Sequence, residues 1–245
     1  MGQWAATRED LFPSQFCREL GYLHAQNKPH SFSYTKKVVE NALNLAFGVP
    51  LSIHDVFLEF NSHPIGVGAI AQVYRAKFRH DIQVTFTGAD GSEDRPSWVA
   101  VKVIHPNAEV DIRRDLHILA IIASLIDVIP TLGWLSIPDE VRTFSEMMLT
   151  QLDMRVEARN LDRFKHGFRY RFDVRFPRAI KGMGTKQVLM EEFIEAVPMS
   201  AFIACRRESL AMDKPDGSTP TNGAFGTVYD AQISGIGLQA FLVSF

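Results

Sequence analysis

The segment Gly66-Val-Gly-Ala-Ile-Ala-Gln-Val-Tyr-Arg-Ala76 joins two closely spaced glycines to a stretch of alternating apolar and polar residues. The alternation over 71–78 is typical of a half-buried β-strand. Glycines before a strand form either an ordinary turn or a loop whose backbone amides can approach a phosphate closely. The glycine pair does not distinguish these alternatives, so the interpretation depends on the segments after residue 76.

A second strand signal, Trp98-Val-Ala-Val-Lys-Val-Ile-His105, contains one lysine among β-branched residues. In a two-sided strand Lys102 shares its face with Ala100 and Ile104, so its side chain points where apolar side chains point. A lysine that loses water in this way needs a charged partner. The alternative is an edge-strand lysine whose long side chain reaches solvent.

A helix predicted over 139–168 carries Asp153 and Glu157 four residues apart, which places the two carboxylates on one face. Taken alone, the pattern also fits a solvated acidic stripe with Arg155 and Arg159 as companions.

The other segments complete the order of elements. Helical periodicity is present at 13–26, 33–47, 110–128 and 139–168, and strand-like segments lie at 71–78, 81–88, 98–105, 173–180 and 187–197. A glycine loop, a Val-Ala-Val-Lys strand, a helix with a glutamate and two further strands succeed one another as in a protein-kinase N-lobe. We therefore predict an α+β fold with an antiparallel sheet and a long C-type helix.

Such a lobe has defined chemical roles for these groups. The backbone amides of Gly66, Gly68 and Ala69 would approach the phosphates, and Lys102 would neutralise them while a helix glutamate holds the lysine in place. The segment 190–194 would offer backbone groups to the adenine edge.

Composition limits the other possibilities. The chain has 245 residues, 46% hydrophobic composition and a net charge of −2, which gives no indication of a nucleic-acid partner. Cys17 and Cys205 are far apart and match no metal or redox spacing. The longest apolar run, Leu116–Pro130, falls short of the roughly 20 residues that span a bilayer, so we predict a buried helix there.

The stretches "GVGAIAQVYRA", "VAVKVIHP" and "LDMRVEARNLDRF" together resemble the UbiB-type atypical kinases, also called aarF-domain kinases. The resemblance covers almost the whole chain and is strongest to the mitochondrial aarF-domain kinase 2 subgroup. It implies a role for each motif residue: Lys102 as the phosphate lysine, Glu157 as its helix partner, Glu191 to Phe193 as the hinge, Gln151 and Asp153 as the ends of the Glu-x-Asp motif, and Gly2 and Gln3 as the end of the Lys-x-Gly-Gln motif.

The resemblance also implies a function. It points to ATP or ADP with magnesium as cofactors, and to ATPase-like or small-molecule work rather than protein phosphorylation. It implies a mitochondrial setting in support of coenzyme Q synthesis or lipid handling, with a lipid or membrane surface as a partner of the parent protein. Oligomeric state is not readable from the sequence.

Two departures from the family pattern qualify these expectations. Met1 stands at the x of Lys-x-Gly-Gln, and the sequence stops before the His-Ala-Asp catalytic loop and the Asp-Phe-Gly-like metal motif that relatives carry. We therefore expect a catalytically incomplete chain with no catalytic or metal residue and most of the C-lobe missing. The expected divisions are 1–50 as a helical extension, 51–205 as the N-lobe, 206–226 as a polar insert and 227–245 as the first C-lobe helix.

Three interpretations stay open at this point. The chain is a fragment of a UbiB-type kinase, a non-catalytic pseudokinase or partner-binding module, or an unrelated α+β interaction domain with a similar pattern.

Overall fold

A computed structural model describes residues 28–86, 98–129, 136–171 and 173–197, together with positions 13, 15–17, 19 and 201. The chain divides into two compact units, and the larger comprises residues 1–162 and 177–193. The sheet and the candidate site belong to this larger unit. Gly2, Gln3, the predicted insert at 206–226 and the predicted helix at 227–245 lie outside the described residues, as does most of the predicted helix at 13–26.

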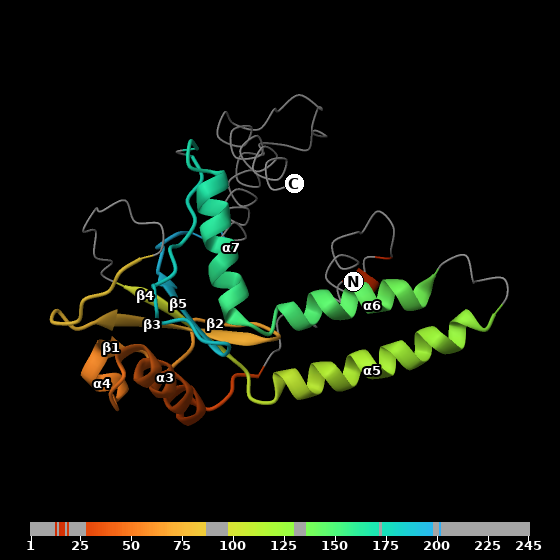
Figure 1. The fold of residues 1–245 in the computed structure, drawn as a ribbon, viewed down its shortest axis with the longest axis horizontal. Helices are drawn as coiled ribbons and strands as arrows, with labels where there is room; N and C mark the ends of the chain where they lie inside the picture. The colour runs from red at the N-terminus through yellow and green to blue at the C-terminus, as the bar shows by residue number, and fades with distance from the viewer. Residues whose placement is uncertain are drawn as a thin grey trace, which may run out of the picture. The chain divides into compact units, whose positions relative to one another are not determined.

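The centre of the larger unit is an antiparallel sheet in the order β1-β3-β4-β5, with β2 paired to β3 (Figure 1). Its strands are β1 (Phe57–Phe60), β2 (Gly66–Val67), β3 (Ala71–Phe78), β4 (Val99–Ile104) and β5 (Val188–Glu192). Strand β4 lies between two neighbours, and Lys102 stands opposite Val73 on one side and Leu189 on the other. The alternative of an edge-strand lysine is therefore wrong.

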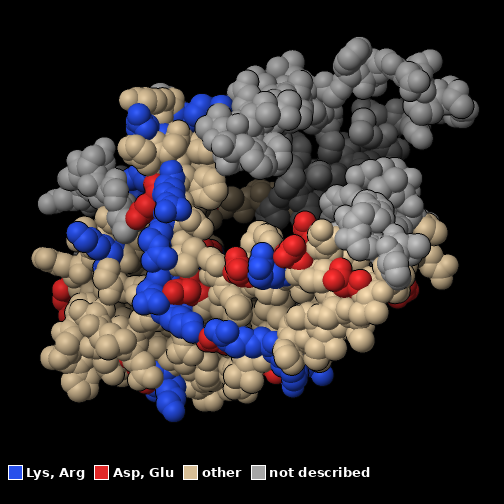
Figure 2. Space-filling model, turned by 45° about the vertical axis from the view of Figure 1, so that its right-hand side comes forward, with Lys and Arg blue, Asp and Glu red and all other residues tan. Residues whose placement is uncertain are grey.

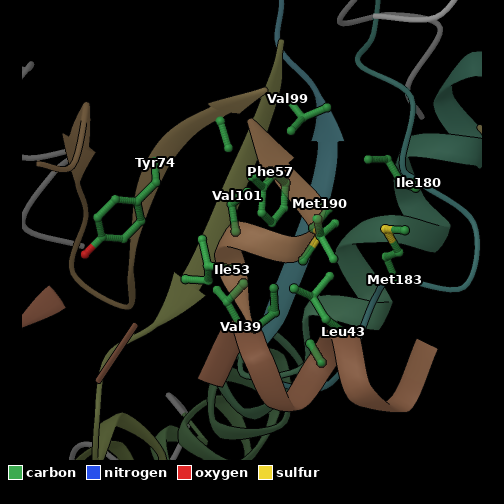
Figure 3. Close-up of a cluster of buried hydrophobic side chains, with 14 of the residues drawn as sticks. Val39, Leu43, Ile53, Phe57, Tyr74, Val99, Val101, Ile180, Met183 and Met190 are labelled. Carbon is green, nitrogen blue, oxygen red and sulfur yellow. The ribbon is translucent and has the colours of Figure 1, made fainter. Parts of the chain in front are cut away.

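The helices are α3 (Phe32–Phe47), α4 (Ile53–Val56), α5 (Ala108–Asp127), α6 (Ile137–Thr150) and α7 (Met154–Gly167). One face of the sheet is covered by α3 and α4, whose side chains Val39, Leu43 and Ile53 pack with Val101 and Met190 in a continuous apolar core (Figure 3). Helix α3 stops at Gly48, whose φ of 72° is the left-handed conformation that glycine adopts readily.

The opposite face of the sheet receives the first turns of α7. Met154 packs there with Ile104, Ala179 and Leu189 in a second, smaller cluster. Alternation along β4 explains the two clusters: Val99, Val101 and Val103 face α3, while Ala100, Lys102 and Ile104 face the other way. The lysine thus lies on the face that α7 covers.

Helices α5 and α6 run side by side as a hairpin (Figure 1). Of α5 only Ala123 is buried, so the predicted burial of this helix is wrong. Ile118, Ile121, Ile122 and Leu125 are all exposed. No helix among the described residues combines the length and hydropathy that a membrane span requires.

Charged groups near the base of the hairpin are paired. Glu109 of α5 accepts hydrogen bonds from Arg113 on its own helix and from Lys186, whose Nζ lies 2.5 Å from Glu109 Oε2. The Lys186 contact joins the hairpin to the segment that enters β5. On the face drawn in Figure 2, acidic side chains accordingly lie beside the basic ones.

Most predicted elements are present with small boundary changes. The structure differs at three places and adds three elements. The helix predicted over 139–168 is interrupted at residues 151–153, and the strands predicted at 81–88 and 173–180 reduce, where described, to the isolated bridges Phe86–Ile180 and Ala179–Glu191. Helix α4 and strands β1 and β2 were not predicted.

Core packing by α3 gives a first testable prediction. Leu43 is 0% exposed and Leu45 is 78% exposed on the same helix. Leu43→Ala should lower the free energy of unfolding by about 2–5 kcal/mol because it leaves a cavity against the sheet. Leu45→Ala, the matched control, should change it by about 0.5 kcal/mol or less. Urea denaturation measures both values, and equal losses would contradict the packing described.

Candidate functional site

The Lys102 ammonium group is held by two carboxylates from different elements. Its Nζ lies 2.5 Å from Glu157 Oε1 on α7 and 3.1 Å from Glu191 Oε1 on β5. The Lys102 side chain is 24% exposed, and that of Glu191 is 7% exposed. The lysine is therefore fixed inside the fold by charge, as its position on β4 predicted.

The electrostatics of this cluster favour a protonated lysine. Burial works against the ammonium, but Glu191 and Glu157 outweigh it and raise the pKa of Lys102. Burial also raises the pKa of Glu191, although Lys102 opposes this effect. Glu191 Oε2 is buried and has no hydrogen-bond partner in the part of the chain that the structure describes. The Lys102 ammonium group thus lies between two carboxylates, and Glu191 Oε2 is a buried acceptor without a hydrogen bond among the described residues.

A cavity of about 510 Å³ opens beside Lys102. Its volume is within the range of roughly 300–1,000 Å³ that small-molecule sites occupy. The residues that line it come from the glycine loop, β3, β4, the α6–α7 junction and α7: Gly68, Ala69, Ile70, Ala71, Val73, Lys102, Thr150, Gln151, Asp153, Met154, Val156, Glu157 and Asn160.

The glycine loop above the cavity is a tight turn. Ile65 N–H donates to the Val73 carbonyl and Gly68 N–H donates to the Ala71 carbonyl, both at 2.8 Å. A Cβ at position 68 would lie 3.2 Å from the Ala71 oxygen, so the turn favours glycine there. The Ala69 amide donates no backbone hydrogen bond among the described residues, which leaves it free to meet a ligand.

Asp153 explains the break between α6 and α7. Its Oδ1 accepts a hydrogen bond from the Arg155 backbone N–H at 2.9 Å, so it caps the amino end of α7. The Arg155 side chain also binds both oxygens, at 2.9 and 2.7 Å. Asp153 is therefore an N-terminal cap rather than an interior helix residue four positions before Glu157. A capping residue before a helical stretch is a local signal that could have been found in the sequence.

The structure brings together most of the predicted site residues. The cavity beside Lys102 is lined by six of them: Gly68, Ala69, Lys102, Gln151, Asp153 and Glu157. Gly66 lies in β2 and does not line it.

The predicted hinge has a different geometry from that expected. Glu191 contributes its side chain, which pairs with Lys102. The backbone amides of Glu192 and Phe193 donate to the carbonyls of Arg178 and Trp98 at 2.9 and 3.2 Å. Phe193 is not among the residues that line the cavity, and its ring lies 5.0 Å from the Arg75 guanidinium.

Sequence reasoning missed two groups around the site. Asn160, which the sequence places near the same helix face three residues after Glu157 but to which no role was assigned, lines the cavity. His30 and His105 meet beneath the glycine loop, 75 residues apart, with their Nδ1 atoms separated by 2.7 Å. No local sequence pattern indicates the contact between His30 and His105.

Comparison with known proteins adds independent information. Residues 23–214 match the model of the ABC1 atypical kinase-like domain. A mitochondrial ABC1 family protein of Saccharomyces cerevisiae is 39% identical over 208 residues, which cover 85% of this chain and 31% of that protein. A mitochondrial ABC1 family protein of Schizosaccharomyces pombe is also 39% identical, over 92% of this chain and 34% of its own length. A probable protein kinase UbiB of Pasteurella multocida is 31% identical over 82% of this chain and 36% of its own. The chain spans about a third of the length of these relatives.

The cap at Asp153 gives a second prediction. Asp153→Ala should reduce the free energy of unfolding by about 1 kcal/mol, whereas Asp153→Asn should keep most of it, because asparagine also caps helices well. The hydrogen bond from Arg155 lowers the pKa of Asp153, so the charged group adds stability above its unfolded pKa of about 3.9. That contribution is lost as pH falls through the lower folded value. Urea denaturation at pH 7 compares the variants, and identical losses for both would refute the capping role.

Proposed function

Because the chain belongs to the ABC1 atypical kinase-like domain family, we propose that the cavity beside Lys102 binds the phosphate groups of ATP or ADP. The observation that carries this proposal is the partly buried ammonium group of Lys102, which two carboxylates hold at the wall of a cavity under a glycine turn. Phosphate binding requires a fixed cation and backbone amides that approach closely, and the site supplies both.

Each residue then has a defined role in binding. Lys102 neutralises the phosphates, and Glu157 fixes the direction of the lysine side chain. Ala69 offers its amide, and Gly68 permits the turn that brings that amide close. The segment Glu191–Phe193 would meet the base beyond the residues that line the cavity, and the amides of Glu192 and Phe193 are already hydrogen-bonded within the fold. Gly66 supports the loop from β2.

The motif residues Gln151 and Asp153 form the floor of the cavity at the α6–α7 junction. The family resemblance, in which this motif pairs with the Lys-x-Gly-Gln segment, supports ATPase-like or small-molecule work over protein phosphorylation; Gly2 and Gln3 of that segment lie outside the described residues.

The whole protein's role is proposed from its relatives. Relatives from two yeasts are named as mitochondrial and a bacterial one as a probable UbiB kinase. We infer a mitochondrial protein that supports ubiquinone synthesis or lipid handling. Magnesium would accompany the nucleotide in the whole protein, but the described residues contain no group of three or more acidic, histidine or cysteine side chains that could hold a metal ion. No residue is therefore assigned to it.

The alternative function is a non-catalytic pseudokinase or partner-binding module. The exposed apolar side chains of α5 favour it, because a patch of this kind suits a protein or lipid surface. The two functions differ in whether the cavity takes up nucleotide.

Thermal unfolding with and without ATP tests the proposal and is our third prediction. At ATP concentrations of about 100 Kd, ligand binding adds about 2.7 kcal/mol, which should raise the melting temperature by about 5–10 °C for a domain of this size. Lys102→Ala should abolish this shift because the phosphates lose their cation.

Lys36→Ala is the matched control, since Lys36 is an exposed lysine on α3, outside the cavity lining. It should retain the full shift. Lys102→Ala also leaves two carboxylates without their cation, so its melting temperature without ATP should fall. The decisive quantity is therefore the shift produced by ATP in each variant. A wild-type chain that ATP does not stabilise would rule out nucleotide binding and favour the partner-binding module.

A further inference from the structure

A continuous chain of hydrogen bonds runs from β3 to the glycine loop. Tyr74 Oη lies 2.8 Å from Thr35 Oγ1, which lies 2.8 Å from His30 Nε2. His30 Nδ1 lies 2.7 Å from His105 Nδ1, and His105 Nε2 lies 3.0 Å from the Gly68 carbonyl oxygen. At the other end, Gln72 Nε2 donates to the Tyr74 hydroxyl.

The side-chain amide of Gln72 fixes the direction of the chain at its first end. Gln72 Oε1 accepts the His30 backbone N–H at 3.1 Å, and Gln72 Nε2 donates to the His30 backbone carbonyl at 3.3 Å. A flipped amide would place donor against donor and acceptor against acceptor. Gln72 Nε2 must therefore face Tyr74, and as a donor it leaves the tyrosine hydrogen to point onward to Thr35.

The Gly68 carbonyl fixes the same direction at the other end, because a carbonyl oxygen only accepts. His105 must carry its hydrogen on Nε2, and in the neutral ring its Nδ1 is then an acceptor. His30 must donate from Nδ1, and its Nε2 then accepts from the Thr35 hydroxyl. Both ends require one polarity and opposite tautomers in the two histidines.

Burial of the chain makes this polarity costly to reverse. Gln72, Thr35 and Tyr74 are all 0% exposed. Reversal would leave the tyrosine hydrogen facing a donor in the interior. Burial, together with the neighbouring His105, lowers the pKa of His30 to about 4. A neutral His30 at physiological pH is what the chain needs, since an imidazolium has no acceptor nitrogen.

The contact with Gly68 has a geometric consequence for the next amide. The Gly68 carbonyl and the Ala69 N–H belong to one planar trans peptide, so they point in opposite directions. Binding of the carbonyl by His105 therefore directs the Ala69 N–H away from His105. Ala69 lines the cavity, and its amide donates no backbone hydrogen bond among the described residues.

We propose that His105 is a positioning residue that sets the orientation of the Gly68–Ala69 peptide for phosphate, with its tautomer fixed through His30, Thr35, Tyr74 and Gln72. The consequence for phosphate rests on the proposed function, whereas the orientation of the peptide and the two tautomers do not.

Ring ¹⁵N chemical shifts test the tautomers directly. Two-bond ¹H–¹⁵N correlation spectra of the chain should show His30 protonated on Nδ1 and His105 protonated on Nε2 at pH 7. Signals are assigned from the spectra of single histidine variants. Thr35→Val, which keeps the side-chain shape, removes the hydroxyl, and His30 should keep its proton on Nδ1 because the Gly68 carbonyl still fixes the tautomer of His105. Two rings with the same tautomer in the wild type would overturn the proposal.

Two substitutions at His105 test the effect on the loop and form our fourth prediction. His105→Phe keeps a ring without a donor, while His105→Gln keeps an amide N–H close to the position of Nε2. His105→Phe should weaken ATP binding about tenfold, the value of roughly one hydrogen bond. His105→Gln should stay within about threefold of the wild type.

The ¹³C chemical shift of the Gly68 carbonyl supplies a readout without nucleotide. It should change in His105→Phe and remain near the wild-type value in His105→Gln, because only the former removes the hydrogen bond to that carbonyl. If the wild type binds no ATP, the proposed function fails while this measurement still decides the positioning role. A Gly68 carbonyl shift that is the same in both variants, or equal ATP affinity of His105→Phe and the wild type, would overturn it. A general loss of folding would instead lower the melting temperature of both variants alike.

Discussion

The ammonium group of Lys102 is where three separate segments of the chain meet. It lies on β4, and its carboxylate partners come from the first turns of α7 and from β5. Breaking a buried pair typically costs about 3–5 kcal/mol, a value that applies to Glu191, whose side chain is 7% exposed, and so this contact constrains the register of β4 with β5. Glu157 is 41% exposed, and its contact with Lys102 orients the start of α7 on the sheet. The cavity takes its shape from the same contacts, because the glycine loop and the α6–α7 junction are its other walls.

Much of this arrangement was predictable because it depends on local periodicity. The period of two along Val99–Ile104 placed three valines on one face and Lys102 on the other, and the structure confirms this division. The α+β class and the N-lobe order were inferred from the succession of elements, and the family match confirms them. The glycine pair of the loop proved ambiguous in isolation: position 68 is sterically restricted, whereas a Cβ at position 66 would meet open space.

The unpredicted features depend on contacts between distant segments. Glu191 and Glu192 are adjacent in a strand, so one must face α7, and only the pairing of Lys102 with Leu189 reveals that it is Glu191. The His30–His105 contact depends in the same way on the docking of the segment before α3. The apolar sequence of α5 predicted burial because composition reports hydrophobicity but not the neighbours that would cover it. The break at Asp153 was different, since its capping signal was local and was overlooked.

That break has a mechanical consequence. An uninterrupted helix from residue 137 onward would act as a stiff rod, and any tilt of its first half would swing Glu157 away from Lys102. The structure instead ends α6 at Thr150 and starts α7 with its own cap and with a bond from Met154 N–H to the Lys186 carbonyl at 3.1 Å. The start of α7, and with it the Glu157 carboxylate, is therefore fixed by contacts of its own and not by continuity with α6.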